Sequence, residues 1–424
     1  MTYALRIVLA LLVISLLGGV LTGSSIYIHL SYFWTLILCG SWIMSFLALR
    51  SLTLKRASRT LRSQVGQIFE ERYELRNNGR LPRLWIEVRD LSPLPGARGS
   101  HVLNMIGGNE SRTYVSRTRL TDRGVFMLGP TMLVSGDLFG LFPIKRIISN
   151  QNKLLVYPVM VDVSNFPNPP GLLPGGEALR RRTPQITSNA AGIREYEPGD
   201  PLNRIHWMST ARRDRLIVKE FELDPLAEIC ILVDASKSVQ LSKPYVRPDF
   251  DPRDVWRTRF KYDLPPSTIE YAVTIAASLV RYYLQQGRAV GLVTADQNLR
   301  ILPADRGGRQ LGKALETLAL IRPEGNLPLE GLVEAQARHL PRGSTVIMIT
   351  PSASDKVYRT ADLLIRRGLR PISVLIDGST FGGSSNPESL VSLLQSLNVP
   401  IFKVGQGDDL SKILSIAVGI SIFR

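Results

Sequence analysis

The sequence predicts an α/β protein in which a two-helix membrane hairpin and a small antiparallel β-rich domain precede a doubly wound α/β domain. Three observations support this fold class. Residues 7–49 contain no Asp, Glu, Lys or Arg, short alternating runs fill residues 64–165, and apolar strands alternate with amphipathic helices in residues 228–424. Alternation of strands and helices at this spacing is typical of a parallel sheet with helices on both faces.

The uncharged run is about twice as long as one crossing of a ~30 Å hydrocarbon core requires at ~1.5 Å of rise per helical residue. We therefore expect a hairpin over residues 1–50, with spans at about 4–21 and 32–49. A basic juxtamembrane segment, residues 51–63, follows the second span, whereas the turn between the spans has no Lys or Arg. This asymmetry predicts a multi-pass protein of the cell membrane with cytoplasmic C-terminal domains, and cleavage of the first span as a signal peptide would leave the same orientation.

The next two segments differ in composition. Residues 64–165 are expected to form the β-rich domain, because apolar and polar residues alternate over 67–76 and a turn signal follows. A Pro/Gly linker then opens residues 166–227, which also contain a dense cluster of charged and aromatic residues. This linker marks the boundary before the α/β domain.

Composition excludes several functions. The chain has 52 Lys and Arg against 36 Asp and Glu, a net charge of +16, which favours contact with an anionic partner such as lipid headgroups, nucleic acid or an acidic protein. No nucleic-acid-binding motif is present, so for a membrane-anchored chain we expect membrane lipids and no nucleic acid. Two cysteines form no disulfide framework, and four scattered histidines have no metal-ligand spacing. Gly307–Ala314 matches a phosphate-binding loop except for Ala314, so no nucleotide is expected. Because no catalytic constellation is found, we do not expect an enzyme.

The sharpest local pattern is Asp234-Ala-Ser236-Lys-Ser238, which directly follows the apolar run Ile229–Val233. Ligands of open α/β sheets lie beyond the carboxyl ends of strands, and one carboxylate with two hydroxyls offers the oxygen ligands that Mg²⁺ or Mn²⁺ prefers. Asp234, Ser236 and Ser238 are therefore candidate metal ligands. A capped turn without metal is the alternative that the residues leave open.

A second, longer pattern occupies the end of the linker segment. Its candidate residues are Arg194, Tyr196, Pro198, Gly199, Asp200, Arg204, Trp207, Arg212, Lys219 and Glu222. The Asp200 carboxylate can hold one of the arginines, and Trp207 offers a face on which an arginine can stack. The pattern predicts either a partner-binding surface or a salt-bridged brace between domains.

Both patterns together resemble bacterial inner-membrane proteins of the domain of unknown function 58 family. The resemblance rests on Arg194-Glu-Tyr-Glu-Pro-Gly-Asp200, Arg204-Ile-His-Trp207, Val218-Lys-Glu-Phe-Glu222, Asp234-x-Ser-x-Ser238 and, upstream, Gly136-Asp-Leu-Phe-Gly-Leu-Phe142. It implies that the α/β domain is von Willebrand factor A-like, and thus Rossmann-like. It also implies a degenerate metal-ion-dependent adhesion site, since Pro351 stands where that family of sites has an aspartate.

The resemblance further implies association with a MoxR-type AAA+ ATPase. We therefore expect a membrane-anchored adaptor or scaffold that binds this protein partner through the incomplete site, with the Arg194–Arg212 block extending the surface or bracing the domains. The alternative is a basic membrane-surface protein that binds anionic lipid or polymer, with a purely structural α/β domain. The alternative predicts a steep salt dependence of binding.

Overall fold

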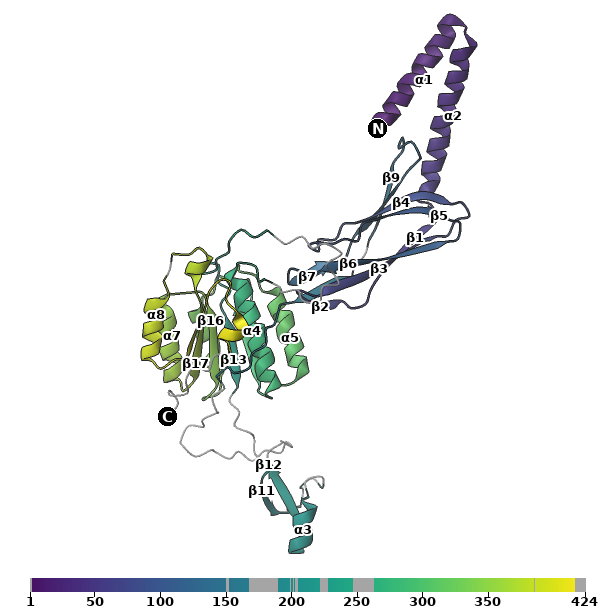
Figure 1. Ribbon diagram of the computed structural model, residues 1–424. Coiled ribbons are helices and arrows are strands. Elements are labelled where there is room, and N and C mark those ends of the chain that lie inside the picture. The colour runs from purple at the N-terminus through teal and green to yellow at the C-terminus, as the bar shows by residue number, and fades with distance from the viewer. Residues whose placement is uncertain are drawn as a thin grey trace. The chain divides into compact units, whose positions relative to one another are not determined.

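The computed structural model describes residues 2–149, 152–167, 190–198, 200, 202, 205–221, 228–246, 263–384 and 386–415. These residues divide into two compact units, one within residues 1–158 and 246–262 and the other within 159–245 and 263–424. In Figure 1 the first unit is coloured purple to blue, and the second runs from teal to yellow. Each unit has its own hydrophobic core.

The first unit begins with a helical hairpin, α1 (Tyr3–Thr22) and α2 (Ser25–Ala48), which Figure 1 shows as two long antiparallel helices. Gly23 ends α1 in the left-handed conformation that lets the chain reverse at once. Both helices are long and apolar enough to cross a membrane, and most of their large apolar side chains are exposed. In water so much exposed apolar surface is unfavourable, which is consistent with a lipid environment.

The rest of the first unit is built from three small sheets. Their strand orders are β1-β3-β6, β2-β10-β7 and β5-β4-β8-β9, and all pairs are antiparallel except β2 with β10. The strands are β1 (Leu52–Ser58), β2 (Arg62–Gln64), β3 (Ile68–Asn77), β4 (Arg83–Asp90), β5 (His101–Ile106), β6 (Ser111–Arg119), β7 (Gly124–Met127), β8 (Thr131–Ser135), β9 (Ile144–Ile148) and β10 (Lys153–Tyr157). Alternate residues of β3 are buried, so its apolar side chains enter the core with Ile86, Val88 and Leu133.

The second unit contains a six-stranded sheet in the order β15-β14-β13-β16-β17-β18. Only β15, at one edge, runs antiparallel to its neighbour. The strands are β13 (Ile229–Val233), β14 (Val290–Ala295), β15 (Leu299–Asp305), β16 (Thr345–Thr350), β17 (Arg370–Ile376) and β18 (Ile401–Val404). The first two parallel strands in the chain, β13 and β14, lie side by side, and β16 adds on the other side of β13.

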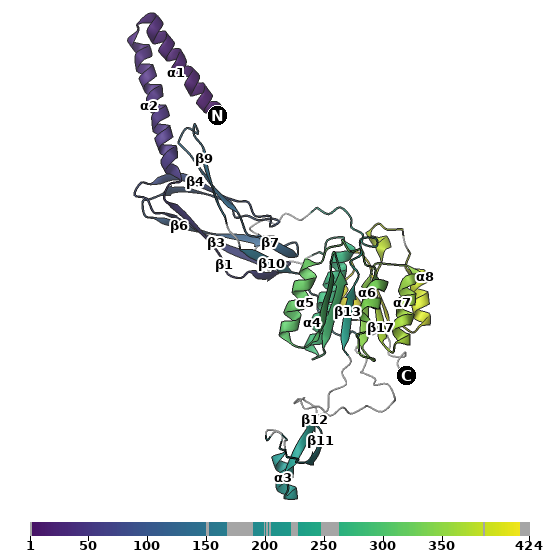
Figure 2. The ribbon, with the colours of Figure 1, turned by 180° about the vertical axis from the view of Figure 1, so that it is seen from behind.

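Helices cover both faces of this sheet. They are α4 (Thr268–Gln285), α5 (Gly308–Leu320), α6 (Leu329–Gln336), α7 (Asp355–Arg366), α8 (Glu388–Ser396) and the short α9 (Leu410–Ile413). All five residues of β13 are buried, and Cys230 and Leu232 share a core cluster with α6, α7 and α8. Because successive side chains alternate, Ile229, Ile231 and Val233 face the opposite side, where α4 packs on β13 and its neighbours. Figure 2 shows the two helical layers from behind.

A small element precedes the large sheet in the second unit. It is an antiparallel pair, β11 (Ala190–Glu195) and β12 (Ile217–Phe221), with the short helix α3 (Trp207–Arg213) between the two strands. We call it the motif module, because it includes most of the Arg194–Arg212 block. Within the module, α3 packs against β12.

At the level of fold class the sequence-based prediction is confirmed, because the structure combines two apolar N-terminal helices with sheets and a mixed α/β region. The second helix begins at Ser25, seven residues before the span expected from hydropathy. Residues 52–58 of the expected juxtamembrane segment form β1, a strand that was not predicted from the sequence. The edge strand β15 was also missed.

Candidate functional site

The Asp234 carboxylate lies at the carboxyl end of the central strand β13. Its Oδ1 accepts hydrogen bonds from the Ser236 backbone N–H (3.0 Å) and the Ser236 hydroxyl (2.6 Å). Its Oδ2 accepts one from the Thr350 hydroxyl (2.7 Å), at the end of the neighbouring strand β16. Two adjacent parallel strands therefore bring a carboxylate and two hydroxyls together at one edge of the sheet.

This carboxylate is almost completely buried. Burial raises the pKa of Asp234 above its usual value, and the hydrogen bonds from Ser236 and Thr350 counteract only part of that shift. Within the described residues no Lys, Arg or His forms an ion pair with it. The ionised Asp234 carboxylate is thus stabilised by hydrogen bonds from hydroxyl and amide groups alone.

The loop after Asp234 is fixed by a second strand-like contact. Gly325 donates its N–H to the Ala235 carbonyl (3.0 Å) and accepts from the Lys237 N–H (2.8 Å). A Cβ on Gly325 would stand 2.3 Å from the Ala295 carbonyl oxygen, so only glycine fits here. The Gln240 side chain adds a hydrogen bond to the Asp234 carbonyl (2.6 Å). These contacts leave Lys237 and Ser238 exposed at the tip of the loop.

Two further aspartates follow parallel strands at the same edge, and neither was predicted from the sequence. Asp296 follows β14 and pairs with Arg300 (3.2 Å), and Asp377 follows β17 and pairs with Lys403 (3.2 Å). Burial raises the pKa of Asp377, but hydrogen bonds from Ser379 and Lys403 outweigh it and leave the pKa lowered. Their position immediately after each apolar run is a signal that could have identified them. Unlike Asp234, each has its own cation.

The three predicted metal ligands have different surroundings. Asp234 and Ser236 are buried and bonded to each other, whereas Ser238 is exposed and its hydroxyl makes no hydrogen bond with the described residues. Among those residues no group of three or more His, Cys, Asp or Glu could hold a metal ion. One carboxylate whose oxygens already accept hydroxyl hydrogens is an incomplete ligand set for Mg²⁺ or Mn²⁺. The metal therefore stays a prediction.

The motif module places part of the Arg194–Arg212 block. Arg194 on β11 forms an ion pair with Asp200 (2.7 Å), whose other oxygen accepts the Glu197 backbone N–H (3.0 Å). The Tyr196 N–H donates to the Leu216 carbonyl (2.9 Å). Asp200 thus closes the turn and holds Arg194, one of the arginines expected to pair with it.

The remaining residues of the block are placed only in part. Pro198 lies in the turn, and Lys219 lies in β12 opposite Ile193, while Gly199, Arg204 and Glu222 lie outside the described residues. Trp207 begins α3 with 67 % of its surface exposed, and Arg212 is exposed on the same helix. None of the cation–π contacts between described residues involves Trp207.

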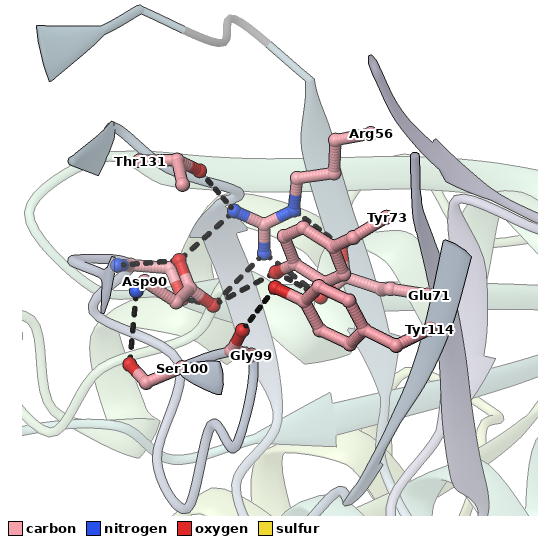
Figure 3. Close-up of polar contacts among 9 residues, drawn as sticks. Arg56, Glu71, Tyr73, Asp90, Gly99, Ser100, Tyr114 and Thr131 are labelled. Atoms are coloured by element: carbon pink, nitrogen blue, oxygen red, sulfur yellow. Dashed lines mark hydrogen bonds and ion pairs between the residues drawn. The ribbon is translucent and has the colours of Figure 1, made fainter. Parts of the chain in front are cut away.

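A third polar cluster, in the first unit, was not anticipated. Figure 3 shows the Arg56 guanidinium between the carboxylates of Glu71 (2.7 Å) and Asp90 (2.9 Å). It also stacks over the Tyr73 ring, which lies parallel to the ring of Tyr114. Arg56 belongs to the basic segment expected at the membrane surface, yet it is turned inward from β1. The cluster ties β1, β3 and β4 together, which is a structural role.

Known proteins similar to this chain say little about activity. A Bacillus subtilis (strain 168) protein, Uncharacterized protein YeaD, is 21% identical over 332 residues, which are 76% of this chain and 75% of YeaD. Among solved structures, the CARDB domain of a Pyrococcus furiosus protein in complex with di-metal ions is 14% identical, with a TM-score of 0.19, over 25% of this chain and 91% of that one. A Vibrio harveyi GH20 exo beta-N-acetylglucosaminidase is 8% identical, with a TM-score of 0.18, over 82% of this chain and 60% of that one.

The family comparison is more specific. Residues 192–247 match the family described as Protein of unknown function DUF58. This range contains the Arg194–Arg212 block and the Asp234 loop, whereas the upstream segment Gly136–Phe142, which also contributed to the resemblance, lies outside it. The match over residues 192–247 and the distant relative YeaD support the resemblance to the DUF58 family of proteins of unknown function.

Proposed function

We propose that the protein is a membrane-anchored scaffold whose α/β domain faces the cytoplasm and binds a protein partner, a MoxR-type AAA+ ATPase. The binding surface would be the loop after Asp234 at the carboxyl edge of the sheet. The observation that carries the proposal is the contrast between the buried Asp234 and its exposed neighbours Lys237 and Ser238. The choice of an AAA+ ATPase comes from the family resemblance alone.

The chemistry of this edge supports a positioning role for Asp234. A buried carboxylate without a cation destabilises the folded state unless hydrogen bonds compensate for its burial. The hydrogen bonds that compensate for it also fix the conformation of the loop. Here Asp234 holds Ser236 directly, and Gly325 holds the next residue, Lys237. The exposed Lys237 and Ser238 are thereby presented in a fixed conformation, which lowers the entropic cost of binding a partner.

Two observations support a doubly wound, von Willebrand factor A-like fold for this domain. In chain order the strands of the sheet run 3-2-1-4-5-6, the order of doubly wound dinucleotide-binding domains, with an antiparallel strand at one edge. Helices also cover both faces of β13. In such sheets ligands bind outside the carboxyl ends of the strands, which is where Asp234 and Thr350 lie.

We assign no step to a metal ion, because the described residues supply one carboxylate and hydroxyl groups. A Mg²⁺ or Mn²⁺ ion at Asp234 would need carboxylates from the partner. Dependence of the complex on a divalent ion would therefore arise only after the partner has bound. This point is checked by repeating the binding assay in a chelator.

The proposal is tested with the detergent-solubilised full-length protein and the purified ATPase. We expect Lys237→Glu and Ser238→Trp to abolish binding, since both side chains are exposed and neither substitution disturbs the core. Asp234→Ala should also abolish it through loss of the loop conformation. Arg338→Glu is the matched control, because Arg338 is equally exposed after α6 and the same charge reversal there should leave binding unchanged.

Unchanged affinity of both loop variants would overturn the proposed surface. If no ATPase binds and the wild-type protein instead binds anionic vesicles or polymer with a steep salt dependence, the chain is a basic membrane-surface protein. In that case Asp234→Ala should have no effect on binding. The two functions therefore give opposite results with the same variants.

A further inference from the structure

A pocket of about 200 Å³ lies in the first unit, between the end of α2 and the β-rich region. Its apolar lining includes Met44 and Leu47 from α2 and Leu84 from β4, and its polar lining includes Arg83 and Ser135. An apolar pocket with one or two polar groups is the usual form of a small-molecule site. The polar group of interest here is Arg83.

The Arg83 side chain carries a buried charge without a counter-charge. The residue is only 7 % exposed, and its Nη2 donates to the Arg50 carbonyl oxygen (3.0 Å). Its Nε has no hydrogen-bond partner among the described residues, and no carboxylate of that part of the chain forms an ion pair with it. Burial alone lowers the pKa of the guanidinium, with no acidic neighbour to raise it. A buried unpaired cation is destabilising, so an anion in this pocket would be strongly favoured.

The pocket lies at the end of the hairpin where the helices meet the β-rich region. Thr2, the N-cap of α1, donates to the Leu141 carbonyl (2.9 Å), and Ser45 of α2 donates to the Phe142 carbonyl. The start of α1 and the end of α2 are thus held against one loop, residues 136–142. Gly136 of this loop also lines the pocket.

The same loop exposes two large apolar side chains beside the hairpin. The Asp137 carboxylate accepts the backbone N–H groups of Phe139 (3.0 Å), Leu141 (3.1 Å) and Phe142 (2.7 Å), which fixes the turn. Leu138 and Phe139 are then left 68 % and 60 % exposed. Rigid, exposed apolar side chains next to a membrane span are typical of contact with the lipid interface.

We propose that this pocket binds the phosphate of a phospholipid headgroup, with Arg83 as its cation and the lipid chains along Met44 and Leu47. A guanidinium presents its N–H groups as a fork that matches two phosphate oxygens. The volume accommodates a phosphate with its glycerol, while the chains remain in the bilayer. The inference rests on the proposed membrane anchoring and is independent of partner binding at Asp234.

The test uses the full-length protein in a neutral detergent without added phosphate. Dihexanoyl phosphatidylglycerol, dihexanoyl phosphatidylcholine and inorganic phosphate are titrated separately, with stoichiometry from native mass spectrometry and affinity from the thermal shift. We expect one phosphatidylglycerol per chain. Arg83→Met should weaken its binding by about tenfold or more, the loss expected for a charge-assisted hydrogen bond. Lys145→Met, which removes an exposed charge from β9, should bind as the wild type does.

Two readouts separate a binding defect from a folding defect. Without ligand, Arg83→Met should melt at the same temperature as the wild type or higher, because it removes a buried unpaired charge. Leu47→Trp, which fills the pocket and keeps Arg83, should also abolish the thermal shift.

The choice of ligand identifies what the pocket recognises. If the protein binds phosphatidylcholine as well as phosphatidylglycerol, this result supports recognition of the phosphate itself. An equal shift with inorganic phosphate would keep the phosphate site and overturn the lipid as its source. Equal lipid binding by wild type, Arg83→Met and Leu47→Trp would overturn the site.

Discussion

Two arginine–carboxylate pairs on neighbouring strands of the first unit share their chemistry and differ in their surroundings. Arg56 pairs with Glu71 at 2.7 Å, and their side chains are 5% and 3% exposed. Arg117 pairs with Glu70 at 2.6 Å, with side chains 37% and 46% exposed. Because β3 carries both glutamates in succession, one points into the core and the other to solvent. Burial therefore decides what each pair contributes to stability.

Removal of the buried cation should be the more damaging change. Arg56→Met leaves Glu71 and Asp90 buried beside each other without a counter-charge, and we expect a loss of about 3–5 kcal/mol in the free energy of unfolding. Arg117→Met should cost only about 0–1 kcal/mol, since water screens the exposed pair. Denaturant unfolding of the two variants in the same detergent measures both values. Equal losses would show that the buried Arg56 pair stabilises the fold no more than the exposed Arg117 pair does.

The two strand-end aspartates Asp234 and Asp377 should respond to pH in opposite directions. The folded-state pKa of Asp234 is raised above the ordinary value of 3.8, so the folded chain binds the proton more tightly than the unfolded chain. Its contribution to stability therefore falls as the pH rises from about 4 toward the raised pKa. The pKa of Asp377 is lowered, and its stabilising contribution is lost as the pH falls below 3.8 toward the folded pKa.

Asparagine substitutions at Asp234 and Asp377 test this difference in pH dependence. Relative to the wild type, Asp234→Asn should gain stability with increasing pH, because the amide carries no charge to bury. Asp377→Asn should lose stability at neutral pH, because the ion pair with Lys403 is gone. Melting temperatures between pH 2 and 8 cover both titration ranges. A parallel pH dependence for the two variants would contradict the contrast between the sites.

In the α/β region, the loop around Gly325 packs between the end of β14 and the Asp234 loop. A Cβ at this position would lie 2.3 Å from the Ala295 carbonyl oxygen and 2.9 Å from that of Ala235. Gly325→Ala should therefore cost about 1–3 kcal/mol, as overpacking does, and displace Lys237. A methyl group added to Gly312, inside α5, would meet no atom within 4 Å, and Gly312→Ala should gain about 0.5–1 kcal/mol. The opposite signs are checked by chemical denaturation.

The regular elements of the α/β region were predictable because their periodicity is local. The hydrophobic pattern of the strand Ile229–Val233 and of the amphipathic helix Thr268–Gln285 can be recognised within a short stretch of sequence. β15 was missed because it lies at an edge with alternate residues exposed, and β1 because its basic residues resembled a membrane-surface segment. Among these four elements, local pattern identified the buried strand and helix and missed the two edge strands.

The candidate site was predictable only in part for a related reason. Asp234 and Ser236 lie two residues apart and form a recognisable motif, and the structure joins them. Thr350 and Gly325 complete the arrangement from about 90 to 116 residues away, and only the sheet order brings them to Asp234. The lack of a partner for the Arg83 Nε likewise could not be predicted from the sequence, because it depends on which groups the fold places around this side chain.

For the molecule as a whole, the proposed orientation depends on where basic residues lie relative to α1 and α2. The turn between the helices has no Lys or Arg, whereas Arg50 and several others follow α2. Arg56 is paired inside the β-rich region and should contribute little to contact with lipid headgroups. Lys55, Arg59 and Arg62 are exposed, which keeps the asymmetry that favours a cytoplasmic C-terminal region.

Cysteine labelling tests this orientation directly. The chain has two cysteines, of which Cys230 is buried with a pKa raised by burial to about 12, so it should not react with maleimide. In a Cys39→Ala background, Ser25→Cys lies at the turn of the hairpin and Ser389→Cys on the exposed side of α8. A membrane-impermeant maleimide applied to intact spheroplasts should label Ser25→Cys and reach Ser389→Cys only after lysis. The reverse pattern would invert the orientation, and labelling of both positions in intact cells would show that the hairpin does not anchor the α/β domain in the cytoplasm.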